Sequence, residues 1–91
     1  MNVEQRLLDA GYEDVIYFTN PSYDSAFIGV SSDYRAIYDY ELMIRYLMSE
    51  EGMTDEEAID WIDYNTIRAL PYMENDGNAP VIMYGVDWLG I

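Results

Sequence analysis

The sequence predicts an α+β fold: a small three- or four-stranded, mostly antiparallel sheet with two or three helices on one face. Three observations predict it. Apolar residues make up 51% of the 91 positions, which is enough to build one core in a single domain over residues 1–91. Short runs of β-branched and aromatic residues are bounded by turn formers. Longer stretches carry apolar residues at helical spacing behind capping residues.

The first two predicted helices each begin after a capping residue and end at a glycine. Residues 3–10 follow Asn2, and residues 40–51 follow Asp39. A glycine comes directly after each stretch, as is common where a helix stops. The inward-facing side chains predicted for residues 40–51 are Leu42, Met43, Tyr46 and Leu47.

A third helix is predicted over residues 55–68. Thr54 and Glu57 have the spacing of a capping box, and the acidic first turn suits the positive end of the helix dipole. Pro71 lies just beyond the predicted end. The side chains expected to face inward are Ala58, Ile59, Ile62 and Thr66.

Four short runs predict strands at residues 15–18, 26–30, 35–38 and 80–84. The first two are expected to pair as a hairpin, because a dense group of turn formers separates them. The short third run extends this pair to a meander, and the last joins the sheet. Gly29 interrupts the second strand and predicts a bulge or a close backbone approach.

The charge is the most unusual property of the chain. Eighteen Asp and Glu face four Arg, with no Lys, which gives a net charge of −14. Binding to nucleic acid requires cations that displace the counterions on phosphate, so we expect no direct nucleic-acid binding. The same charge argues against an anionic membrane surface. It favours a basic protein partner, whose approach it would accelerate.

The absence of Cys and His limits the chemistry. It leaves no disulfides, no thiolate–imidazole zinc site and no imidazole base for a serine nucleophile. Residues 74–78 lack the ligand spacing of a calcium loop. We therefore expect no enzyme activity, no cofactor and no metal. No basic leader and no apolar run of membrane length is present, so a cytoplasmic location is expected.

Carboxylates at helical spacing form the candidate partner-binding site. Glu56, Asp60 and Asp63 occupy positions i, i+4 and i+7 of the third predicted helix, and therefore one face of it. Glu50 and Glu51 lie just before them, across a tight turn. The simpler interpretation is a solvated helix face, which charged stretches usually form. The complete lack of Lys favours a binding role, because soluble surfaces normally mix both signs of charge.

The ten tyrosines are the second unusual feature. Most are expected to fill the core and its edges, whereas Tyr23 and Tyr34 are predicted to be exposed anchors for a partner. Asn65 interrupts a helix and is expected to be a buried capping or network residue. The segment 85–91 contains Trp88 and Leu89 and is expected to dock on the domain.

Four stretches, residues 14–21, 26–31, 57–66 and 79–84, resemble a family of small acidic proteins of bacteria and their phages or mobile elements. The resemblance covers most of the chain and implies no catalytic residue and no particular activity. In its short length, acidity and lack of lysine, the chain is also similar to phage anti-CRISPR and anti-restriction proteins that mimic DNA.

The leading hypothesis is an acidic interaction protein that occupies the basic surface of a nucleic-acid-binding protein, as a nucleic-acid mimic or inhibitor. One alternative is a homo-oligomeric structural or accessory protein, a homodimer for example, joined through surplus aromatic residues near Trp88. Another is a small-molecule-binding domain or a minor enzyme with a carboxylate–tyrosine pocket.

Overall fold

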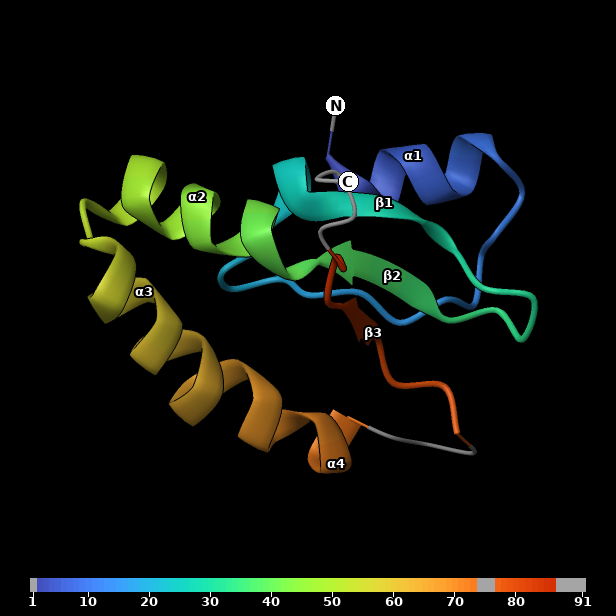
Figure 1. Ribbon diagram of the computed structural model, residues 1–91. Coiled ribbons are helices and arrows are strands. Elements are labelled where there is room, and N and C mark those ends of the chain that lie inside the picture. Colours follow the sequence, from blue (N-terminus) through green and yellow to red (C-terminus); the bar gives the residue numbers. More distant parts are fainter. Residues whose placement is uncertain (1, 74–76, 87–91) are drawn as a thin grey trace.

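Three strands form one sheet in the order β1–β2–β3 (Figure 1). β1 (Phe27–Val30) runs antiparallel to β2 (Ala36–Asp39), and β3 (Val81–Met83) runs parallel to β2 on its other side. The computed structural model describes residues 2–73 and 77–86. The α+β fold with a three-stranded sheet is confirmed, and its strands lie where three of the four predicted runs lie.

The strand predicted at residues 15–18 is absent, and with it the hairpin to residues 26–30. This segment is irregular, although Val15 and Phe18 are buried. The N–H of Phe18 donates to the hydroxyl of Tyr38 at 3.1 Å, so a side chain takes the place of a strand partner. β1 pairs instead with β2, and the pairing register shifts between Phe27 and Gly29, which confirms the predicted bulge.

The first two helices match their predictions closely. α1 (Val3–Asp9) is capped by Asn2, whose side chain accepts from the N–H of Gln5 at 2.8 Å. α2 (Tyr40–Glu51) is capped by Asp39, which accepts from the N–H of Leu42 at 3.0 Å. Both caps supply an acceptor to a helix N–H that has no partner within the helix. The predicted inner face of α2 is confirmed: Met43 and Leu47 are fully buried, and Leu42 and Tyr46 are half-buried.

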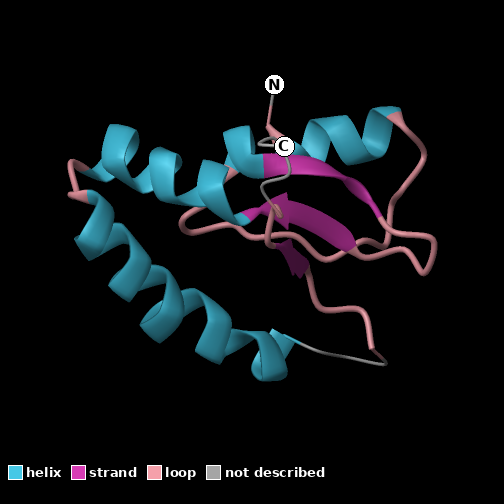
Figure 2. Ribbon diagram, in the orientation of Figure 1, coloured by secondary structure: helices cyan, strands magenta, loops and turns pink. Residues whose placement is uncertain are grey.

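The third predicted helix extends beyond Pro71 and changes its winding on the way. α3 (Asp55–Trp61) continues as a π-helical turn, η2 (Ile62–Thr66), then a 3-10 turn, η3 (Ile67–Ala69), and α4 (Leu70–Met73). Figure 2 shows these as one helical path. Pro71 fits because it lies in the first turn of α4. A backbone N–H has no partner within the helix at that position, so its absence in proline costs no hydrogen bond.

The inner face of this path is narrower than predicted. Ala58, Ile62 and Thr66 are buried as expected, at a spacing of four residues. Ile59 is 38% exposed, so its predicted inward position is wrong. It lies one position round from Ala58, which turns its side chain about 100° away from the core.

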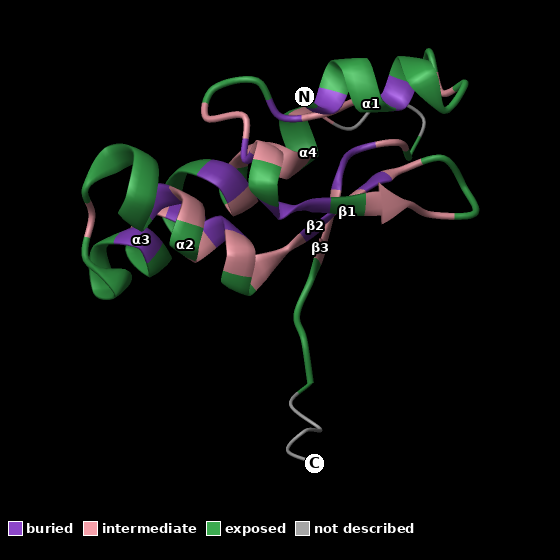
Figure 3. Ribbon diagram, turned by 90° about the horizontal axis from the view of Figure 1, so that it is seen from above, coloured by how far each residue is buried: buried purple, intermediate pink, exposed green. Residues whose placement is uncertain are grey.

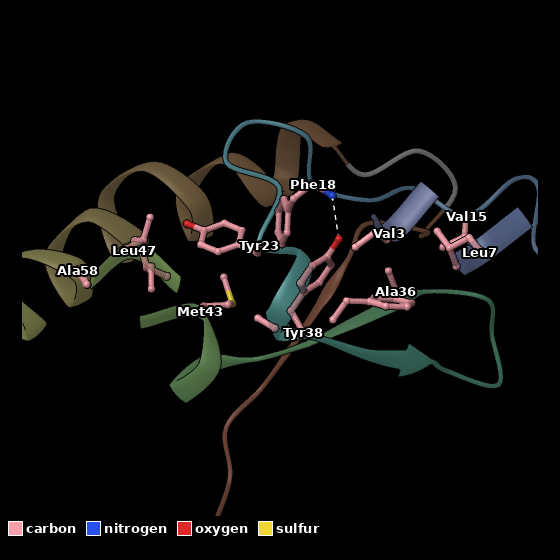
Figure 4. Close-up of a cluster of buried hydrophobic side chains, with 13 residues drawn as sticks. Val3, Leu7, Val15, Phe18, Tyr23, Ala36, Tyr38, Met43, Leu47 and Ala58 are labelled. Atoms are coloured by element: carbon pink, nitrogen blue, oxygen red, sulfur yellow. Dashed lines mark hydrogen bonds between the residues drawn. The ribbon is translucent and has the colours of Figure 1, made fainter. Parts of the chain in front are cut away.

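Every helix buries its apolar face on the same side of the sheet, around Tyr38 (Figure 4). Val3 and Leu7 of α1 join the core there, as do the buried residues of α2 and α3. The η segments and α4 complete this layer. Among them, η1 (Asp24–Ala26) leads directly into β1. Figure 3 shows α1 and α4 on one side of the sheet, with the stretch after β3 leaving on the other.

Two predictions fall outside the described residues. The loop at residues 74–78 is described only from Gly77 onward, and the docking of Trp88 and Leu89 lies beyond Val86. Across residues 2–73 and 77–86, no helix is long and apolar enough to cross a membrane.

Candidate functional site

A helical hairpin made of α2, α3 and η2 carries the predicted carboxylates (Figure 1). Gly52 ends α2 in the left-handed conformation, with φ of 68°. The Thr54 hydroxyl then accepts from the N–H of Glu57 at 3.1 Å, while the Glu57 carboxylate accepts from the N–H of Thr54 at 2.8 Å. This confirms the capping box and fixes where α3 begins. We define the acidic hairpin by its seven exposed carboxylates: Glu50, Glu51, Asp55, Glu56, Glu57, Asp60 and Asp63.

All five carboxylates predicted to bind a partner belong to the acidic hairpin. Glu50 and Glu51 lie at the end of α2, and Glu56 lies in the first turn of α3. Asp60 and Asp63 follow along the same helical path, so the charge runs from the apex of the hairpin toward the sheet. In the described part of the chain, none of these seven carboxylates forms a salt bridge, so no cation offsets their negative charge.

The arginines do not gather near the acidic hairpin. Arg68, the next cation along the chain, places its guanidinium 4.4 Å from the centre of the Tyr64 ring. Both residues border a broad depression of about 750 Å³ on the outer side of the helix, together with Asp60 and Asp63. Arg45 lies on α2, one helix turn from Glu41, with the charged groups 3.9 Å apart. The other two arginines lie away from the hairpin: Arg6 lies over Phe27, and Arg35 donates to the carbonyl of Ala79.

Two carboxylates of the acidic hairpin act on Tyr40, the first residue after β2. Tyr40 opens α2, and its pKa is raised above the usual value, first by burial and then by the charge of Asp63. Tyr84 and the charge of Asp60 raise this pKa further. The two ring centres of Tyr40 and Tyr84 are 4.8 Å apart. Asp60 and Asp63 are therefore near enough to Tyr40 for their charge to act on its phenol.

Among the described residues, no helix covers one face of the sheet. Ala36 and Tyr38 point into the core, so the alternation of the strand places Ile37 and Asp39 on the opposite face. The parallel register sets Ile37 beside Val81. In Figure 1, no described helix crosses in front of the strands. We define the open face by four residues: Ile37, Asp39, Val81 and Met83.

The open face continues into exposed apolar side chains. Tyr84 is 57% exposed and Val86 is 76% exposed, directly after β3. Met83 and, at the bulge of β1, Ile28 are also exposed. Exposed apolar side chains of this size are typical of a protein-binding surface. The sequence of β3 could not reveal this exposed surface, because all three of its side chains are apolar and no alternation marks which of them face outward.

Tyr23 is not an exposed anchor, contrary to the prediction. Its side chain is fully buried, with its ring 5.5 Å from that of Phe18 and 5.6 Å from that of Tyr46, centre to centre. Its backbone is left-handed, with φ of 50°, and this turns the ring inward. Tyr34 is 65% exposed and packs edge-on against Tyr12 at 5.6 Å. Tyr34 is thus accessible, and its binding role stays a prediction.

A pocket of about 360 Å³ lies beside the acidic hairpin, between residues 18–23 and the helical path from α3 to α4. Its inner wall holds the hydroxyls of Tyr23 and Thr66, which are hydrogen-bonded at 2.7 Å. Burial raises the pKa of Tyr23 to about 12, so the phenol stays neutral at physiological pH. The residues that line the pocket are Phe18, Thr19, Asn20, Pro21, Tyr23, Trp61, Asn65, Thr66, Ala69 and Met73.

Asn65 does the capping that was predicted, but from an exposed position. Its side-chain N–H donates to the carbonyl of Trp61 at 3.1 Å, next to the π-helical turn. The prediction of burial is wrong, because the pocket keeps this side of the helix open to solvent. The only sequence signal for the pocket is this stretch of poor helix formers within an otherwise helical segment.

No group of three or more carboxylates among the described residues is arranged to hold a metal ion. Comparison of the chain with known protein families, with curated proteins and with solved structures found no significant match.

Proposed function

We propose that this protein is an acidic interaction protein that occupies the basic surface of a nucleic-acid-handling protein and so competes with the nucleic acid. The uncompensated carboxylates of the acidic hairpin carry the proposal. They are exposed, they lie on one rigid helical hairpin, and no described cation pairs with them. At a net charge of −14 they attract a basic partner over a distance, which accelerates encounter.

The spacing of the carboxylates supports mimicry of a phosphate backbone. Four residues of helix rise about 6 Å, and seven rise about 10 Å. Phosphates follow one strand of a duplex every ~3.4 Å along its axis, so these separations correspond to about two and three steps. Glu56, Asp60 and Asp63 can thus engage cations that are spaced to grip a nucleic-acid strand.

The open face supports a protein partner over a small ion or a loose counterion cloud. It places apolar side chains beside the charge, and Tyr40 and Tyr84 lie where the two meet. Apolar contact supplies affinity that salt does not screen, whereas the carboxylates supply attraction and register. The expected partner therefore has a basic groove with an apolar ridge at its border.

The test is affinity capture from a lysate of the native host, with bound proteins eluted by duplex DNA. We expect DNA to release a nucleic-acid-handling protein. The triple variant Glu56→Gln, Asp60→Asn, Asp63→Asn should lose this capture. The matched control, Asp9→Asn, Glu13→Gln, Asp14→Asn, removes the same charge from three exposed positions near the end of α1 and should keep it.

The outcomes separate the site from the overall charge. Equal loss in both triple variants would show that net charge alone acts, not the acidic hairpin. If both triple variants still capture the partner and DNA still releases it, the binding site lies on another face of the protein. The absence of any protein that DNA releases would refute the mimic.

The open face also favours a second candidate, a homodimer. An exposed apolar sheet face can pair with a copy of itself about a twofold axis. Two chains of charge −14 repel each other, so a dimer through this face should strengthen with added salt. Sedimentation at low and high salt tests this, with Met83→Glu expected to keep the chain monomeric. A monomer at all salt concentrations would rule the homodimer out.

A further inference from the structure

The pocket beside the acidic hairpin differs in charge from the rest of the surface. Charged residues make up 24% of the chain, yet among the described residues, 2–73 and 77–86, no Asp, Glu or Arg lines this pocket. A smaller hollow of about 160 Å³ adjoins it around Pro21 and Trp61, and Glu51 borders that hollow instead. An uncharged pocket in so acidic a protein selects against ligands that need a counter-charge.

The polar groups of the pocket can still form hydrogen bonds. Asn65 uses its N–H on the carbonyl of Trp61, and its side-chain oxygen makes no bond within the described residues. Thr19 and Asn20 are exposed at the rim, and their side chains likewise make no hydrogen bond within the described residues. The hydroxyls of Tyr23 and Thr66 are buried behind this wall and are hydrogen-bonded to each other, so the exposed amides and the Thr19 hydroxyl are the groups that can meet a ligand. Both donors and acceptors are therefore available.

The apolar walls are flat or flexible. Trp61 presents an indole that is half-buried, opposite the turn that holds Pro21. Phe18 and Met73 complete the walls, and a methionine adapts to the edge of an aromatic ring. Such walls suit a planar ring that stacks on the indole, since every aromatic heterocycle has a π-face.

We propose that this pocket binds a free nucleoside, through its planar, uncharged base. The base would stack on Trp61, and its polar edge would meet the exposed amides of Asn20 and Asn65. The volume of about 360 Å³ lies within the range of small-molecule sites. Nothing in this site needs the acidic hairpin, so nucleoside binding is independent of the proposed partner.

Other ligand classes fit less well. A phosphate-bearing ligand meets a net charge of −14 and no cation in the pocket. A cation would find no carboxylate among the described lining residues. An aliphatic ligand would cover the amides without replacing their water contacts, which is costly.

The test is a titration of the ¹⁵N-labelled protein, observed by amide and indole chemical shifts, with adenosine, guanosine, cytidine and uridine in turn. At least one nucleoside should give saturable shifts at the indole of Trp61, the side-chain amides of Asn20 and Asn65, and the backbone of Ala69. A Trp88→Phe background assigns the indole signal to Trp61.

Two variants locate the site. Ala69→Phe fills the pocket from its helical wall and should weaken binding at least tenfold; Ala10→Phe, an exposed alanine at the end of α1, is its control. If Ala69→Phe fails to fold, Asn20→Ala still reports, because the side chain is exposed. It should weaken binding about fivefold, the loss expected for one neutral hydrogen bond.

A second arm identifies the source of the base. Adenosine monophosphate and a short single strand should bind more weakly than the nucleoside, and added salt should narrow that gap by screening the repulsion. A strand that binds more tightly than every nucleoside would overturn the free-nucleoside proposal. So would the absence of saturable shifts with all four nucleosides, or shifts confined to another surface.

Discussion

Tyr23 joins two parts of the molecule that are far apart in the sequence. Its ring packs among Phe18, Tyr38 and Tyr46, and its hydroxyl reaches Thr66 on the π-helical turn. The sequence placed it in a loop, and loops usually lie at the surface. Its burial depends on a left-handed backbone and on a partner 43 positions away, and neither leaves a local signal.

Tyr23→Phe should destabilise the fold by about 1–2 kcal/mol, because it leaves the buried Thr66 hydroxyl without a partner. Urea denaturation measures the change. The double variant Tyr23→Phe, Thr66→Val should cost less than the sum of the single variants, since it removes both ends of one bond. Tyr72→Phe, at an exposed hydroxyl, is the control and should change nothing. Strict additivity would show that the bond does not contribute.

Stability should fall steeply in alkali because of the buried phenols. Burial raises the pKa of both Tyr23 and Tyr38 to about 12, from an ordinary value of 10.0. A raised pKa means that the folded state holds the proton more tightly. The stabilisation is therefore complete below pH 10 and is lost as the pH rises toward 12. Urea midpoints over this range test it, and Tyr38→Phe should make the fall shallower. A flat profile would contradict it.

At the scale of the element, helices could be predicted and one strand could not. The caps at Asn2, Asp39 and Thr54 are local in sequence, and each fixed a helix start correctly. The run at residues 15–18 had the composition of a strand, but pairing is non-local. The N–H of Phe18 donates to the hydroxyl of Tyr38 instead of pairing with a neighbouring strand. Winding changes such as η2 arise from packing, which composition does not show.

Thr54→Ala should destabilise the fold by about 1 kcal/mol, the usual cost of a lost helix cap. It removes the acceptor for the N–H of Glu57 and loosens the apex of the acidic hairpin. Ser49→Ala, an exposed change at the end of α2, is the matched control and should be neutral or slightly stabilising. Equal effects in the two variants, measured by urea denaturation, would mean that the capping box does not fix α3.

At the scale of the whole molecule, charge sets the behaviour. The acidic residues of the candidate surface could be predicted, because carboxylates at helical spacing stay exposed. The open face could not be predicted, since it depends on every helix packing on the same side of the sheet. The uncharged pocket likewise forms only where residues 18–23 meet a helix more than 30 positions away.

Added salt should stabilise the protein by screening its self-repulsion, by about 1 kcal/mol, or roughly 4–8 °C in Tm. Thermal melts in increasing sodium chloride test this. The triple variant of the acidic hairpin carries less negative charge and should gain less from salt. A Tm that falls with sodium chloride, or an equal gain in both proteins, would show that repulsion in the acidic hairpin does not limit stability.

The parallel pairing of β2 with β3 joins two strands that 41 intervening positions separate, from Tyr40 to Pro80. The segment between these strands contains α2 and α3, so closing the sheet with β3 is a long-range step that we expect late in folding. Ile37 meets Val81 and Asp39 meets Met83 only at that step. A partner that requires the open face would therefore recognise finished molecules and ignore chains that are still folding.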